Sequence, residues 1–243
     1  MPRLRPLLAA LCSCLVSSFE ARAANPYLEI PPEAEVRASP AHTYANMTNA
    51  EAFAELDRRG VAYEHATPPR PGVRAPIRLR GPLHGVHIHS SLPRSEWATT
   101  PYEILDARLA LVLDDFCALL ARHDIVEIVH FTMYRMPTEH SPDPEAPQIR
   151  HPGGMAIDVG ALRKRNGQWL SIGPQWPPAI GARTCGPGAR AMPSRSAREL
   201  VSIVCEAADL RLFHFMLTPH FDDAHADHLH LEIKPGSRWF LVN

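Results

Sequence analysis

The pattern of apolar and polar positions predicts helices and strands that follow one another without regular alternation. The strongest helical pattern opens at Thr100-Pro101, and apolar residues recur at helical spacing up to about Arg122. The β-branched run 125–132 is typical of a core strand. Further strands are predicted at 85–89, 155–162, 169–172, 212–217 and 228–234, and further helices at 48–60 and 196–209. This order lacks the β-α-β rhythm of a doubly wound fold, so we expect an α+β protein: a small, mostly antiparallel sheet with helices against one face.

Two segments precede this domain. Residues 24–46 are rich in Pro, Ala and Glu without clear periodicity, which predicts an extended lead-in to one domain over residues 47–243. Before them, Arg3 and Arg5 are followed by the apolar run 7–16 and by Ala21-Arg22-Ala23, a small-x-small cleavage site. This arrangement predicts a secretory signal peptide over residues 1–23.

The predicted location is outside the cytoplasm, in the periplasm or secreted. The apolar run 7–16 is too short to span a bilayer and no other segment is apolar enough, so no stable membrane span is expected. Leu11-Cys12-Ser13-Cys14 is a poor lipobox because Cys12 is unusual there, and a lipoprotein acylated at Cys14 is the less favoured prediction. A net charge of −1 gives no electrostatic case for nucleic acid. The oligomeric state does not follow from the sequence.

Removal of the signal leaves Cys117, Cys185 and Cys205, enough for one disulfide and one free thiol. Cys185 and Cys205 flank a predicted helix, and a loop staple of this size stabilises by roughly 3 kcal/mol. Cys117 belongs to a helix of apolar pattern. We therefore predict a Cys185–Cys205 bridge and a buried Cys117 thiol.

Two polar groups far apart in the chain carry the candidate chemistry. His228 and His230 lie two positions apart on a predicted strand. Because side chains alternate between the two faces of a strand, both imidazoles point to the same side, about 7 Å apart along the strand. The upstream segment 151–158 supplies His151 and Asp158, and its glycines allow a sharp turn between them. Two His and one Asp make a three-ligand set that leaves Zn²⁺ one open position for water, as in catalytic zinc sites.

These motifs carry a resemblance. The pattern H-x6-D followed by H-x-H near the chain end resembles the zinc peptidases grouped with lysostaphin, the D-Ala-D-Ala carboxypeptidases and hedgehog, the LAS metallopeptidases. The run 217–232 resembles the bacterial extensin-like C-terminal domain family, and the likeness extends through residues 151–158 and more weakly to the helix near residue 50. Members of that family are mostly assigned by similarity to murein peptidases. The resemblance implies an LAS/hedgehog-like core with the metal on the open face of the sheet.

The resemblance also implies individual roles. His151, Asp158 and His230 would hold Zn²⁺, and His228 would lie beside the ion, where it can hydrogen-bond a bound water or the oxyanion. Asp227 stands three residues before the last ligand, where some relatives carry the general base; its other interpretation is a carboxylate that orients a histidine. Arg135 follows a Tyr, as does the oxyanion-stabilising Arg of D-Ala-D-Ala carboxypeptidases.

The expected function is zinc-dependent hydrolysis of peptidoglycan stem peptides or cross-links, with Asp227 or His228 as proton acceptor. Whether such an enzyme is an endopeptidase or a carboxypeptidase stays open. Two alternatives also stay open: a non-catalytic cell-wall-binding module with a structural zinc, and a periplasmic metal-binding protein that uses its many histidines. A second histidine group, His84, His87 and His89, lacks a carboxylate in sequence and is interpreted as one face of a strand.

Overall fold

The computed structural model describes residues 28–138, 143 and 146–243. The predicted signal peptide and the Cys12-Ser13-Cys14 segment lie outside the described residues. Within them, no helix has both the length and the apolar character needed to cross a membrane.

One eight-stranded sheet forms the centre of the molecule, with strand order β1-β11-β9-β10-β7-β6-β4 and β8 paired to β7. β11 pairs with β9 and β4 with β6 in parallel, whereas the other pairs are antiparallel. The strands are β1 (Leu28–Glu29), β4 (His87–Ser90), β6 (Ile125–His130), β7 (Ala156–Lys164), β8 (Trp169–Ser171), β9 (Phe215–Leu217), β10 (Leu229–Glu232) and β11 (Phe240–Val242). The α+β class is confirmed, but the sheet is mixed and larger than expected.

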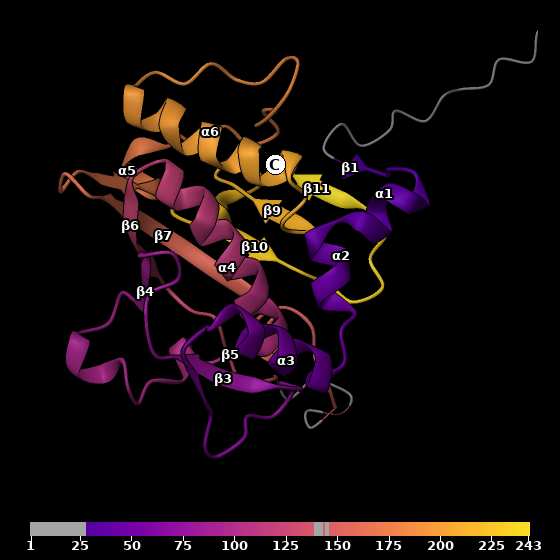
Figure 1. The fold of residues 1–243 in the computed structure, drawn as a ribbon. Helices are drawn as coiled ribbons and strands as arrows, with labels where there is room; N and C mark the ends of the chain where they lie inside the picture. Colours follow the sequence, from indigo (N-terminus) through magenta and orange to yellow (C-terminus); the bar gives the residue numbers. More distant parts are fainter. Residues whose placement is uncertain (1–27, 139–142, 144–145) are drawn as a thin grey trace, which may run out of the picture.

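Two helices cover one face of this sheet, α4 (Ala107–Arg122) and α6 (Arg195–Asp209) (Figure 1). α4 is the central element: most of its side chains are buried, and α2 (Pro40–Ala45), α3 (Asn49–Arg59) and α6 all pack against it. Ser194 caps α6 by accepting a hydrogen bond from the Ala197 backbone. Among the described residues, no α-helix lies across the central strands on the opposite face of the sheet (Figure 1).

α4 begins later than the sequence pattern indicated. Thr100 caps only a 3₁₀ turn (Pro101–Glu103), and the chain then forms the short strand β5 (Leu105–Asp106). Pairing of β5 with β3 (Pro76–Leu79) fixes this extended stretch, and the Asp106 side chain then caps the helix by accepting a hydrogen bond from the Arg108 backbone. The predicted start at Thr100 is therefore wrong, because a distant strand holds residues 105 and 106 out of the helix.

The predicted extended lead-in over residues 24–46 is also wrong where it is described. It contains α1 (Glu33–Ala38) and α2 (Pro40–Ala45). Tyr44 of α2 is buried, and its hydroxyl donates to Asp115 of α4 at 2.7 Å and accepts from Arg59 at 2.6 Å. Helices this short are marginal alone, so packing of α2 on α4 and of α1 on α2, rather than local propensity, makes them helical.

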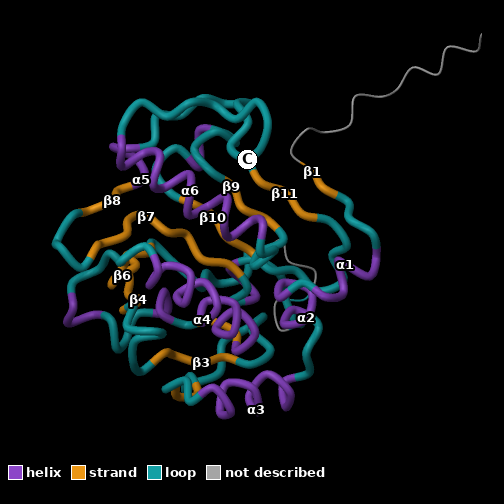
Figure 2. Tube along the Cα trace, turned by 45° about the horizontal axis from the view of Figure 1, so that its top comes forward, coloured by secondary structure: helices purple, strands orange, loops and turns teal. Residues whose placement is uncertain are grey.

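β2 (Tyr63–His65), β3 (Pro76–Leu79) and β5 form a smaller antiparallel sheet. It lies beside α3 (Asn49–Arg59), near the N-terminal end of α4 (Figure 2). Thr48 and Glu51 form the predicted capping box, and Gly60 ends α3 in the left-handed conformation at φ 69°. The short helix predicted from residue 48 is thus confirmed.

The predicted Cys185–Cys205 disulfide is present and joins α6 to the Pro- and Gly-rich segment 175–194. Cys117 is a buried free thiol within α4, also as predicted. Trp176, near the start of this segment, is fully buried, and its indole N–H donates a hydrogen bond to Nε2 of His220 at 3.2 Å. The segment thereby supports the loop that connects β9 to β10.

Candidate metal centre

The two neighbouring strands β7 and β10 place an aspartate and a histidine directly opposite each other. Asp158 and His230 are paired across the antiparallel ladder. Their neighbours Ile157, Val159, Leu229 and Leu231 belong to the buried hydrophobic core. Because side chains alternate along a strand, Asp158 and His230 point to the opposite face, the one without helices.

His151 reaches the same place from the turn that precedes β7. It begins a 3₁₀ turn, His151–Gly153, which ends at Gly154 with φ 63°. A Cβ at Gly154 would lie 2.8 Å from the Asp106 backbone nitrogen, so both conformation and space require glycine there. The mechanical role predicted for these glycines is confirmed at this position.

The three side chains converge through one atom each. Nε2 of His151 lies 3.0 Å from Oδ1 of Asp158, and Nδ1 of His230 lies 2.9 Å from the same oxygen. The two ring nitrogens are 3.2 Å apart. All three residues are buried, and in the described part of the chain they are the one group of His, Cys, Asp or Glu with ligand atoms this close, within 4.8 Å of one another. The ligand set predicted from sequence is thus assembled.

The chemistry of these atoms fits a metal ion. The second ring nitrogen of His230, Nε2, lies 3.2 Å from the carboxylate of Glu232, which favours a proton on Nε2. A neutral His230 then turns the lone pair of Nδ1 toward Asp158 and His151. Three lone pairs that face one another at about 3 Å repel unless a proton or a cation lies among them. Two imidazoles and a carboxylate suit a divalent transition metal.

The pKa shifts of Asp158 and His151 favour the deprotonated forms that bind a metal, whereas the shift of His230 favours its protonated form, which a metal ion has to displace. Burial disfavours a charged His230, but hydrogen bonds to Asp158 and Glu232 outweigh it and raise its pKa. Burial lowers the pKa of His151. Burial also opposes ionisation of Asp158, yet hydrogen bonds from both histidines hold its pKa far below the usual range. The aspartate is therefore ionised, as a ligand must be.

His228 and Asp227 lie beside the three ligand candidates. Nε2 of His228 is 3.6 Å from Oδ1 of Asp158, and its Nδ1 is 2.8 Å from Oδ1 of Asp227. β10 begins only at Leu229, so Asp227 is free of the strand alternation. Asp227 is largely exposed and contacts the centre through His228. His225, whose Nδ1 lies 2.6 Å from Oδ1 of Asp222, adds a fourth imidazole ring, with its centroid 5.1 Å from that of His228.

Arg135 reaches the centre from the segment after β6. Its Nη2 donates to Oδ2 of Asp158 at 2.6 Å, so the second carboxylate oxygen is neutralised while Oδ1 faces the histidines. The side chain is 57% exposed, which leaves the rest of the guanidinium accessible from solvent. All six residues singled out from the sequence, His151, Asp158, His230, His228, Asp227 and Arg135, are thus brought together.

Two residues at the centre were missed in the sequence. Glu232 is buried and lies beside Nε2 of His230, and Arg150 contacts the same carboxylate at 3.4 Å. Arg150 also has φ 55°, a strained conformation for a residue other than glycine. The signal for Glu232 was available, because residues two apart on a strand share a face and Glu232 follows His230 by two. Nothing local in the sequence indicates Arg150.

Other histidines, including the group His84, His87 and His89, lie elsewhere. His220 is buried between Trp176 and Thr184, away from the ligand set. His89 contacts Glu127 of β6 at 2.9 Å, and His84 contacts Asp114 of α4 at 3.1 Å. His87 and His89 belong to β4, so the strand interpretation of this group holds for those two only.

The α+β fold and the buried His-Asp-His group together define a protein with a candidate metal centre on the open face of a mixed sheet. The family described as extensin-like protein C-terminus matches residues 53–241, and the chain belongs to this family. This confirms the first part of the resemblance noted in the sequence. Searches of curated proteins and of solved structures gave no match.

Proposed function

We propose that this protein is an exported zinc-dependent peptidase that cleaves peptidoglycan stem peptides or cross-links. The observation that carries the proposal is the convergence of His151 Nε2, Asp158 Oδ1 and His230 Nδ1 on one point. Three such ligands leave an open coordination position, which is typical of catalytic rather than structural zinc. The disulfide is compatible with an oxidising compartment, and the likeness to LAS peptidases suggests the substrate.

Zinc at this position would supply a water of lowered pKa and an electrophile for the scissile carbonyl. The proton acceptor in this proposal is His228. With Nδ1–H donated to Asp227, its Nε2 carries a lone pair on the side of Asp158. Asp227 is then the carboxylate that fixes this tautomer, and the pair passes the proton to the leaving amine.

Arg135 is the oxyanion donor in this proposal. One of its nitrogens is bound to Asp158, which fixes the position of the guanidinium plane. The other donors of the fork are available to a substrate oxygen because most of the side chain is exposed. Glu232 and Arg150 do not contact substrate; they hold the ring of His230 in the orientation that presents Nδ1.

The test is digestion of purified murein sacculi by the zinc-loaded protein, with the products resolved by mass spectrometry. New amine and carboxyl ends should appear, and they should vanish with a chelator and in His230→Ala. His65→Ala, an exposed histidine on β2, is the matched control and should remain active. The new ends also identify the bond and separate endopeptidase from carboxypeptidase.

Intact murein together with one tightly bound zinc would contradict the peptidase. That result would favour the cell-wall-binding module with a structural zinc, and co-sedimentation of the zinc-loaded protein with sacculi would support it. More than one tightly bound metal per chain would instead favour a metal-binding protein.

A further inference from the structure

The last strand of the large sheet has an open edge. β4 pairs with β6 on one side, and the described residues place no strand on the other. The Ser91 N–H donates to His130 of β6, whereas the Ser90 N–H points away and donates to Oε1 of Glu103 at 2.6 Å. Because backbone groups alternate in direction along a strand, the N–H and C=O of Ile88 point to the same side as those of Ser90. Ile88 therefore presents one donor and one acceptor at the open edge.

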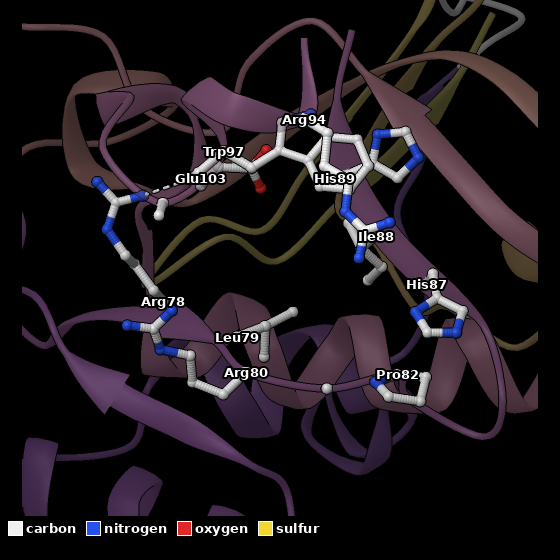
Figure 3. Close-up of a pocket in the computed structure, with 12 residues that line it drawn as sticks. Arg78, Leu79, Arg80, Pro82, His87, Ile88, His89, Arg94, Trp97 and Glu103 are labelled. Carbon is white, nitrogen blue, oxygen red and sulfur yellow. Dashed lines mark hydrogen bonds between the residues drawn. The ribbon is translucent and has the colours of Figure 1, made fainter. Parts of the chain in front are cut away.

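This edge borders a cavity of about 480 Å³ (Figure 3). Ile88 lines it together with His87 and His89, and the segment from Arg78 to Pro82 forms the facing wall. Trp97 stacks on the His89 ring at 3.9 Å and closes a third side. The size lies in the range of ligand pockets and suits a few residues of extended chain.

The charge in this cavity is positive and only partly neutralised. Three arginines line it, Arg78, Arg80 and Arg94, against one carboxylate, Glu103. Arg78 is 8% exposed and donates to the backbone oxygens of Trp97, Thr99 and Thr100. Within the described chain, neither Arg78 nor Arg94 forms an ion pair with a carboxylate. Arg80 does, with Glu64 outside the cavity.

Glu103 is committed to other partners. Its carboxylate accepts from the Ser90 backbone and lies 3.3 Å from Nε2 of His130. The protein thus already places a carboxylate against one outward N–H of β4. The next outward N–H, that of Ile88, lies roughly 7 Å along the strand and faces the cavity.

We propose that the open edge of β4 binds an acidic peptide in extended conformation, which adds to the sheet as a further strand. The backbone of Ile88 exchanges hydrogen bonds with the peptide, and acidic side chains lie against Arg78 and Arg94. A small anion would satisfy the arginines but would leave the carbonyl of Ile88 without a donor. The peptide backbone supplies both partners. This site is independent of the metal centre, so the proposal does not rest on peptidase activity.

The test measures the fluorescence anisotropy of a dye-labelled, end-capped peptide of alternating Glu and Val with the full chain. Arg94 is exposed, so Arg94→Gln should weaken binding about fivefold, as expected for an ion pair at a solvent-accessible side chain, whereas Arg122→Gln on α4 should leave it unchanged. The same peptide with Lys in place of Glu should not bind. Free glutamate at an equal carboxylate concentration should not compete, which separates a peptide from a simple anion.

The strand-like mode is tested through the backbone. Ile88→Pro removes an N–H that is not bonded to β6, so the ladder is kept, and peptide affinity should fall about tenfold. Ile88→Val keeps the N–H and should bind as the native chain does. A peptide N-methylated on alternate amides should also bind about tenfold more weakly, and this measurement needs no change in the protein. Equal binding of methylated and unmethylated peptides, or full competition by glutamate, would overturn the proposal.

Discussion

The candidate metal centre and the β4 groove, the cavity between β4 and the segment 78–82, differ in the kind of group that lacks an ionic partner. At β7 and β10, lone pairs of two imidazoles and one carboxylate face one another. At β4, Arg78 and Arg94 form no ion pair with a carboxylate within the described chain, and Ile88 presents its backbone N–H at the open strand edge. The first arrangement needs a cation and the second an anion. The sign of a ligand can thus be inferred from the unsatisfied atoms, before any chemistry is assigned.

The largest effect is expected at Asp158, the one anionic member of the ligand set. Asp158→Asn should lower zinc affinity by more than about a hundredfold, since even residues that only orient a ligand contribute about 10- to 100-fold. Competition with a chromophoric chelator measures this affinity. Added zinc at about a hundred times its Kd should stabilise the native protein by roughly 3 kcal/mol but not the variant.

Asp222→Asn is the matched control, because Asp222 contacts His225 at the rim and not the ligand atoms. It should bind zinc with nearly native affinity. Equal affinity of the Asp158 variant and the native protein would mean that the three residues form a hydrogen-bonded cluster and not a metal site.

His214 is a buried histidine that, unlike His151 and His230, has no carboxylate partner among the described residues. Burial, together with the nearby charges of His42 and Lys234, lowers the pKa of His214 to about 4. Its Nδ1 accepts from the Lys234 backbone, and the ring stacks on Phe240. The unfolded chain takes up this proton near pH 6.5 and the folded chain only near pH 4, so stability falls as the pH decreases through this window. The loss is on the order of 3 kcal/mol.

His214→Asn keeps an acceptor for the Lys234 backbone but cannot take up a proton. The free energy of unfolding of both metal-free proteins is measured in urea at a series of pH values. It should fall less steeply for the variant as the pH decreases from about 6.5 to about 4. The other histidines contribute equally to both curves, so their difference isolates His214. Parallel curves would show that His214 is not held neutral in the folded state.

A smaller effect on zinc affinity is expected at Glu232, which contacts His230 at Nε2, the ring nitrogen that does not face Asp158. Glu232→Gln keeps a hydrogen-bond acceptor but removes the charge, so zinc affinity should fall about tenfold. The same chelator competition measures it. Glu199 of α6 is also partly buried and forms an ion pair with Lys164 of β7. Glu199→Gln is therefore the control for loss of such a carboxylate, and it should not change zinc affinity. Unchanged zinc affinity of Glu232→Gln would show that Glu232 does not influence zinc binding through His230.

The candidate metal centre could be predicted from the sequence because each of its two halves is local. H-x6-D surrounds one turn, H-x-H lies at one strand end, and strand alternation turns Asp158 and His230 to one face. Elements decided by distant contacts were not accessible. Pairing of β5 with β3 delays the start of α4 to Ala107, and burial of Tyr44 against α4 makes residues 40–45 helical. The β4 groove belongs to this second kind, because only the strand order shows that His87–Ser90 lies at an edge.

The smallest predicted effect concerns Arg80, and it tests whether unpaired charge rather than charge alone defines the groove. Arg80 lines the cavity but is paired with Glu64, and both side chains are about half exposed. Such a pair contributes little and leaves little net field, so Arg80→Gln should change affinity for the acidic peptide by less than about twofold. Glu64→Gln frees the guanidinium and should strengthen binding slightly. If Arg80→Gln weakened binding as much as Arg94→Gln, the cavity would act through its total charge, and the distinction between paired and unpaired arginines would fail.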